Sequence, residues 1–297
     1  MKMIPKFGVI AIAVVASSFL IYGVSTDTKK QLLKEGTAMY FPTQADFCGE
    51  AAPLQIADVR ERFDRELLVN ANLDATTLII LKRANRAFPI IEPILAKNGV
   101  PDDFKYLAVI ESGLVNAVSP AGARGIWQFM PATAKEKGME VNEMVDERYH
   151  LEKSTEAACR YLLDAKARMG SWTLAAASYN GGVSGVTKQI DFQKVTNYYD
   201  LLLTEETARY VFRILALKEI MKNPALYGFT VAPEEMYPLL PVRKVEVDST
   251  INDLASFANS QGINYKILKI HNPWLRDRKL TNLARKKYVL DIPTSGY

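Results

Sequence analysis

A single glutamate in this chain falls on an otherwise apolar helix face. In a helix, Glu111 shares one side with the residues that precede it at i−3, i−4 and i−7, which are Ala108, Leu107 and Phe104. Burial disfavours the charged form of a carboxyl group, so this position should raise the pKa of Glu111. A carboxylic acid with a raised pKa can protonate a leaving-group oxygen near neutral pH. The alternative is a structural glutamate in an ion pair, for which Arg124 is the candidate partner.

Gln128 is the lone amide inside an apolar run at residues 126–130. A polar side chain in such a run needs a hydrogen-bond partner. A sugar hydroxyl or N-acetyl group would serve, and so would the protein's own backbone. The sequence leaves both interpretations open.

An aromatic side chain and an amide, Tyr179 and Asn180, precede the glycines at residues 181–182. Such groups stack on sugars and form hydrogen bonds with them, although an Asn-Gly helix cap has the same spacing. Tyr210 lies four residues after Glu206 on another predicted helix, where packing in the core is the alternative to a site role.

The sequence gives little support for a metal site, a nucleophilic triad or nucleic-acid binding. His150 and His271 are the only histidines, and neither stands at a metal-ligand spacing from a cysteine or carboxylate, so we expect no metal site. The same scarcity weakens a Ser-His-Asp or Cys-His nucleophile. Cys48 and Cys159 could form a bridge or remain two inert thiols. The net charge of +4 is mild, and the basic stretch at residues 276–287 lacks the interleaved aromatics of a nucleic-acid platform, so no nucleic-acid partner is expected.

These side chains must be positioned by a mainly helical body. Apolar periodicity and stop signals predict helices over residues 53–70, from Asp74 towards residue 88, after residues 101–103, and over 131–138, 154–169, 172–179 and 204–223. Pro89 and Pro93 are expected to interrupt the second of these.

The pattern changes after residue 238. Strands are expected at residues 245–247 and 288–292, with two short helices between them. Thr250 and Asp253 have the spacing of a capping box for the first helix. Together these segments predict a βααβ unit of about 50 residues, which is large enough to fold as a module.

In combination the motifs resemble one family. Glu111 with Ser112, residues 119–131 (SPAGARGIWQFMP), residues 178–182 (SYNGG) and residues 206–211 (ETARYV) are similar, in order, to the motifs of family 1 lytic transglycosylases, and most similar to their membrane-bound type D branch. The resemblance covers about residues 90–222. Two positions depart from the common pattern, since residues 125–128 read GIWQ where GLMQ is usual, and Ser178 replaces an alanine.

The resemblance implies a lysozyme-like (goose-type) catalytic domain that cleaves peptidoglycan between N-acetylmuramic acid and N-acetylglucosamine, with glycan strands as the partner and no cofactor. Glu111 matches the catalytic glutamate. The matching substrate-binding positions are Ser119, Gln128, Met130, Tyr179, Asn180, Glu206 and Tyr210.

The implied mechanism uses one carboxyl group, since no second acidic residue accompanies Glu111 in the way that two-carboxylate glycosidases require. Glu111 would act first as acid and then as base, and a 1,6-anhydro ring would close without water. The alternatives are a non-catalytic peptidoglycan-binding protein and a hydrolysing, lysozyme-type muramidase.

The C-terminal unit resembles a LysM module, through residues 247–251 and the Asn-Pro-x-Leu element at residues 272–275. At the other end, Lys2 and Lys6 precede an uncharged run at residues 7–24, which predicts an export signal or, if uncleaved, an anchor in the cytoplasmic membrane. We therefore expect the protein in the cell envelope or periplasm. The expected domains are a signal or anchor at residues 1–25, a helical segment at 26–89, the catalytic domain at 90–230 and the LysM-like module at 242–294.

Overall fold

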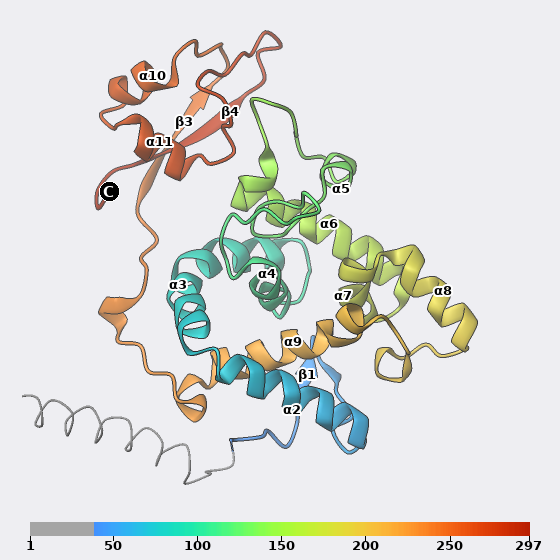
Figure 1. The fold of residues 1–297 in the computed structure, drawn as a ribbon. Helices are drawn as coiled ribbons and strands as arrows, with labels where there is room; N and C mark the ends of the chain where they lie inside the picture. The colour runs from blue at the N-terminus through green and yellow to red at the C-terminus, as the bar shows by residue number, and fades with distance from the viewer. Residues whose placement is uncertain (1–38) are drawn as a thin grey trace, which may run out of the picture. The chain divides into compact units, whose positions relative to one another are not determined.

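The computed structural model describes residues 39–297, and most of this part of the chain is helical (Figure 1). The predicted fold class, a mainly helical body followed by a small βααβ unit, is confirmed. The expected signal or anchor at residues 1–25 lies outside the described residues. Among residues 39–297, no helix has the length and apolar character needed to cross a membrane.

Eight α-helices form the body that precedes the C-terminal unit in the described chain, and a short antiparallel hairpin comes before them. The hairpin strands are β1 (Asp46–Phe47) and β2 (Glu50–Ala51). The helices are α2 (Ala57–Ala71), α3 (Asp74–Lys97), α4 (Phe104–Ser112), α5 (Pro131–Glu136), α6 (Leu151–Met169), α7 (Trp172–Gly181), α8 (Val183–Gln193) and α9 (Glu205–Lys222).

Helix α3 is continuous, so the predicted interruption at Pro89 and Pro93 is wrong. Each proline removes one backbone hydrogen bond from a helix interior. The apolar face nevertheless continues past both prolines, because Ile91 and Leu95 are fully buried. Packing of this face against α4 and α6 offsets the missing hydrogen bonds.

Helix α9 lies at the centre of the body and packs against α2, α4 and α7. Most of its length is buried, while its first turn holds Glu205 and Glu206, whose charges suit the positive end of the helix dipole. Helix α7 is buried through Ala175, Ala176 and Ala177. These small side chains let α6 and α9 approach it closely.

The hairpin has a structural role that the sequence did not reveal. The Glu50 carboxylate accepts hydrogen bonds from the backbone N–H groups of Trp172 and Thr173, at 2.6 and 2.8 Å, and so caps the start of α7. Cys48 lies in the turn of this hairpin, and both it and Cys159 are free thiols. The two cysteines are therefore not bridged to each other.

The C-terminal unit has the predicted βααβ order. It consists of β3 (Val242–Val247), α10 (Leu254–Ser260), α11 (Tyr265–His271) and β4 (Tyr288–Pro293). The two strands pair antiparallel, with Val245 opposite Leu290. The predicted capping box is wrong in one respect: Asp253 itself caps α10 by accepting from the N–H groups of Ala255 and Ser256, whereas the Thr250 hydroxyl accepts from the N–H of Asn282.

Candidate active site

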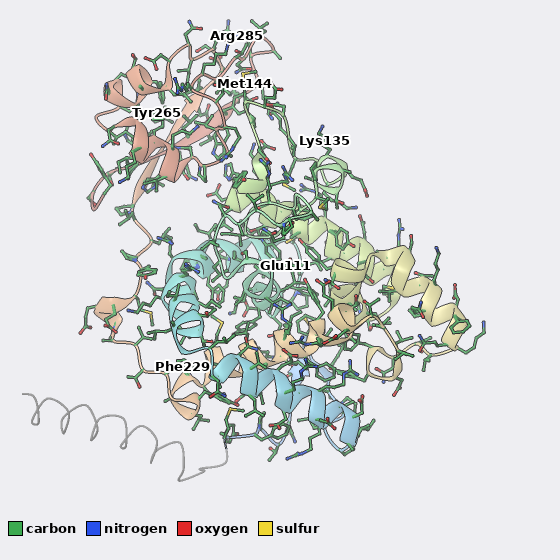
Figure 2. All side chains as sticks on the ribbon, viewed as in Figure 1. Glu111, Lys135, Met144, Phe229, Tyr265 and Arg285 are labelled. Atoms are coloured by element: carbon green, nitrogen blue, oxygen red, sulfur yellow. The ribbon has the colours of Figure 1, made fainter. Side chains whose placement is uncertain are left out.

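Glu111 lies in the last turn of α4, which Gly113 ends in the left-handed conformation. The predicted helix face is present, since Phe104, Leu107 and Ala108 are fully buried. Glu111 itself remains partly exposed. Figure 2 shows its side chain within the helical body, near the middle of the fold. The helix therefore holds the carboxyl group at the edge of the core.

Two tyrosines on different helices accompany Glu111. The Tyr210 hydroxyl, on α9, donates a hydrogen bond to Glu111 Oε1. The Tyr179 hydroxyl, on α7, donates to the backbone carbonyl of Trp127 at 2.7 Å. Burial raises the pKa of both tyrosines well above the ordinary value, so both remain hydroxyl donors at neutral pH.

The electrostatic surroundings keep Glu111 protonated unusually far up the pH scale. Burial raises its pKa from 4.5 to about 7. The hydrogen bond from Tyr210 and the positive charge of Arg213 act in the opposite direction, while the negative charge of Glu206 adds to the rise. The group is thus placed to exist in both protonation states near neutral pH, as an acid/base must.

The alternative of an ion pair with Arg124 is wrong. Arg124 lies 3.7 Å from the Asp146 carboxylate instead. Within residues 39–297, no lysine, arginine or histidine side chain forms a salt bridge with Glu111.

Asn180 and Glu206 form one network with Thr207. The Asn180 amide donates to Glu206 Oε1 at 3.0 Å, and its carbonyl oxygen accepts from the Thr207 hydroxyl at 2.7 Å. The backbone of Gly181 lies close to the Thr207 side chain, since a methyl group on Gly181 would be only 3.0 Å from it. The end of α7 is thereby fixed against the start of α9, with Glu206 exposed.

The remaining predicted site residues lie on one loop, residues 117–130. Ser119 accepts a hydrogen bond from the N–H of Ala123 at 3.0 Å, within the loop. The Gln128 amide nitrogen donates to the carbonyls of Gly125 and Ala117, at 2.7 and 3.2 Å, which is the backbone alternative left open by the sequence. Met130 is 43% exposed at the end of the loop.

This loop is fastened to the Glu111 helix and to α7. The Ser112 hydroxyl, next to Glu111, donates to the carbonyl of Ile126 at 2.8 Å. The neighbouring Trp127 carbonyl accepts from Tyr179, and the fully buried Trp127 ring donates to Thr155 at 2.9 Å. The structure thus brings Glu111, Tyr179, Tyr210 and the 117–130 loop together.

Two arginines near this group were missed by sequence reasoning. Arg213 follows Tyr210 by one turn of α9 and donates to the carbonyl of Ile110 at 3.2 Å. Arg148 is buried and donates to the loop carbonyls of Gly122 and Phe129, both at 3.1 Å. The helical spacing of Arg213 from Tyr210 was a usable signal, whereas nothing local to Arg148 indicates its partners.

No cluster of three or more His, Cys, Asp or Glu side chains suited to a metal ion occurs in the described part of the chain.

Models of two protein families match this chain in two regions. Residues 88–201 match the Transglycosylase SLT domain, and residues 243–296 match the Soluble lytic transglycosylase C-terminal LysM-like domain. The membrane-bound lytic murein transglycosylase D of Escherichia coli K12 is 29% identical over 253 residues, as is the protein of the same name from Escherichia coli O6:H1.

Each of these alignments covers 82% of this chain and 54% of the relative, so the chain spans about half the length of the curated relatives it matches. The family resemblance predicted from the motifs is confirmed. The chain therefore matches a transglycosylase SLT domain followed by a C-terminal LysM-like domain, and it is similar to the membrane-bound lytic murein transglycosylases D.

Proposed function

We propose that this protein is a peptidoglycan lytic transglycosylase, a carbon–oxygen lyase that cleaves the β-1,4 bond between N-acetylmuramic acid and N-acetylglucosamine. The SLT domain and the homology to lytic murein transglycosylase D support the reaction class. The observation that carries the proposal is Glu111, a partly exposed carboxyl group whose pKa burial raises to about 7 and which accepts a hydrogen bond from Tyr210.

In the first step, the protonated Glu111 donates its proton to the glycosidic oxygen, and the bond to the muramoyl anomeric carbon breaks. The substrate's own N-acetyl group stabilises the positive charge that develops there. Tyr210 fixes the orientation of the carboxyl group, because its hydroxyl donates to one of the two oxygens. The other oxygen is then the one that presents the proton.

In the second step, the Glu111 carboxylate takes the proton from the muramoyl C6 hydroxyl. The freed oxygen attacks the anomeric carbon and closes a 1,6-anhydro ring, which returns Glu111 to its acid form. No water is consumed and no cofactor is needed. A pKa close to the working pH suits a group that must donate and accept in one cycle.

Glu206 is a second carboxylate close enough for its negative charge to raise the pKa of Glu111, so its role in the mechanism must be stated. A second carboxylate could serve as nucleophile or base in a hydrolytic mechanism. Glu206 lies in the first turn of α9 and accepts a hydrogen bond from the Asn180 amide. We assign it a substrate-binding role rather than a covalent one.

The substrate-binding residues in this proposal are Ser119, Gln128, Met130, Tyr179, Asn180, Glu206 and Tyr210, of which the buried Tyr210 acts through its hydrogen bond to Glu111. Exposed Met130 offers an apolar surface to a sugar ring. Because the Gln128 amide nitrogen donates two hydrogen bonds to backbone carbonyls, the amide oxygen is assigned to the substrate.

The same proposal places the enzyme in the cell envelope. The catalytic domain is assigned to residues 90–230 and a wall-binding LysM-like module to residues 242–294, with export or membrane anchoring through residues 1–25. The name of the relatives, membrane-bound lytic murein transglycosylase D, supports this location.

Digestion of purified peptidoglycan in ¹⁸O-labelled water, followed by mass spectrometry, tests the proposal. A lytic transglycosylase releases anhydromuramoyl ends that lack one water and contain no label. Labelled reducing ends would instead identify a hydrolysing muramidase, and intact strands would identify a non-catalytic wall-binding protein.

A further inference from the structure

The C-terminal unit shares its hydrophobic core with a segment of the helical body. Val145 and Tyr149 are buried in the same cluster as Leu254, Leu268, Trp274 and Leu290 of the βααβ unit, and Met144 packs against this cluster. Figure 2 labels Met144 and Arg285 in this part of the molecule. Residues 144–149 are therefore structural members of both parts.

Backbone and ionic contacts fasten the same segment. The N–H of Asp146 donates to the carbonyl of Trp274 at 2.9 Å, and the N–H of Arg276 donates to the carbonyl of Met144 at 2.7 Å. Lys286 pairs with Glu140 and lies 3.6 Å from Glu147. A module tethered only by a linker would show none of these contacts.

From residues 146–148, a second set of contacts leads to the loop beside Glu111. The Asp146 carboxylate pairs with Arg148 through two hydrogen bonds, at 2.8 and 2.7 Å, and both side chains are buried. Arg148 then donates to the Gly122 and Phe129 carbonyls of the 117–130 loop. The backbone of Asp146 thus contacts the LysM-like unit. Its side chain contacts Arg148, which holds the 117–130 loop.

The backbone of Gly125, in the 117–130 loop, packs directly against the backbone of Arg148. A methyl group on Gly125 would lie 1.9 Å from the carbonyl oxygen of Arg148, so the two backbones are in direct contact. Residues 126 and 127 of the same loop accept hydrogen bonds from Ser112 and Tyr179 beside Glu111. A shift of residues 146–148 must therefore move or loosen the loop.

We propose that the LysM-like unit positions the substrate loop for catalysis, by holding residues 144–149 so that the Asp146–Arg148 pair fixes residues 117–130 beside Glu111. Asp146 and Arg148 are positioning residues, since they act through the loop. The proposal rests on the proposed function for its consequence in catalysis. This positioning role differs from that of a purely wall-binding module, whose loss would change only the affinity for peptidoglycan.

The test uses charge reversals in the full-length chain. Lys286→Glu places a carboxylate against Glu140 and Glu147 and so weakens the contacts between the C-terminal unit and the helical body. The matched control is Lys287→Glu, because Lys287 is exposed and its acidic partner, Glu246 at 3.7 Å, belongs to the C-terminal unit itself. Val145→Asp is a stronger variant, since Val145 is only 1% exposed in the shared core.

Hydrogen exchange of backbone amides is the first readout, and it does not require activity. We expect the amides of residues 117–130 to exchange about fivefold faster or more in Lys286→Glu, and about tenfold faster or more in Val145→Asp, while Lys287→Glu leaves them unchanged. If residues 144–149 lose protection and the loop does not, the coupling is wrong. Should Val145→Asp fail to fold, Lys286→Glu decides by the same criterion.

The second readout separates positioning from wall binding. On a short soluble glycan oligomer, kcat should fall in Lys286→Glu relative to Lys287→Glu, with KM little changed. A loss confined to binding of insoluble peptidoglycan, with kcat on the oligomer intact, would overturn the positioning role. If the parent chain does not cleave the oligomer, the proposed function fails, while the exchange experiment still tests the structural coupling.

Discussion

The Tyr210 hydroxyl has two effects on Glu111, one on orientation and one on protonation. Burial is the main cause of the raised pKa, and the hydrogen bond from Tyr210 lowers that pKa by favouring the carboxylate. Removing the hydroxyl should therefore leave the acid form stable to higher pH. It should also leave the carboxyl group free to rotate out of its donating position.

We predict that Tyr210→Phe shifts the alkaline limb of the pH–rate profile upward and lowers the maximal rate by about tenfold or more. In the unsubstituted enzyme, kcat/KM should decline as pH rises through about 7, where Glu111 loses its proton. Measured pH–rate profiles of both proteins check this. A downward shift of the limb in Tyr210→Phe would contradict the assigned hydrogen bond.

The same pKa shift affects stability. Because the folded protein holds the Glu111 proton up to about pH 7, while the unfolded chain releases it near the ordinary value of 4.5, stability is lost as pH rises between these values. Glu111→Gln is neutral throughout and avoids this loss. We predict that its free energy of unfolding exceeds that of the parent by about 1–3 kcal/mol at roughly pH 8, and matches it at roughly pH 4.

Denaturant unfolding at the two pH values measures this difference. Glu61→Gln, which alters an exposed glutamate on α2, is the control and should change stability little at either pH. If the difference in free energy of unfolding between Glu111→Gln and the parent were the same at both pH values, ionisation of Glu111 would not cost the folded protein stability, and the prediction would be wrong.

At the scale of elements, the 117–130 loop depends on one glycine. Gly125 has φ +83°, and an added methyl group would meet the Arg148 carbonyl at 1.9 Å. We predict that Gly125→Ala destabilises the protein by about 2–4 kcal/mol and abolishes cleavage, since both the backbone strain and the clash fall on this loop.

Gly122 supplies the comparison for this prediction. It also has a positive φ, of +89°, but no atom lies within 4 Å of an added methyl group. Gly122→Ala should therefore cost only the backbone strain, about 1–2 kcal/mol, and keep part of the activity. Equal losses in the two variants, measured by unfolding and by cleavage assays, would refute the role of the Arg148 contact.

The elements show how far local sequence patterns extend. The Glu111 face was predictable because a helix repeats every few residues, and Phe104, Leu107 and Ala108 mark it. Helix α8 was not predicted, and α3 was expected to break at its prolines. In α3, burial of Ile91 and Leu95 decided the outcome, and burial depends on partners that a local pattern does not contain.

At the scale of the whole molecule, the sequence predicted the two parts but not how they join. The βααβ order follows from strand and cap signals within residues 245–292. The contacts of Asp146 with Trp274 and of Lys286 with Glu140 join residues more than a hundred positions apart. Such pairs have no local signature, so the LysM-like unit was expected as a separate wall-binding module.

The candidate site follows the same division. The motifs indicated Glu111, Tyr179 and Tyr210 together, and the structure brings these residues to one place. The alternative pairing of Arg124 with Glu111 is wrong, because the sequence offered Glu111 nearby and gave no reason to prefer Asp146. Arg124 and Asp146 both lie outside the α-helices, and the way their loops fold together decided that pairing.

The claim that a single carboxyl group performs both proton transfers is tested most directly by comparing Glu111→Gln with Glu206→Gln on purified peptidoglycan. Both substitutions keep side-chain shape and remove one titratable carboxyl group. We predict that Glu111→Gln lowers the cleavage rate by about 10³-fold or more with its fold intact, while Glu206→Gln stays within about tenfold of the parent and still releases anhydromuramoyl ends. Near-normal cleavage by Glu111→Gln, or equal loss of cleavage in both variants, would contradict the account.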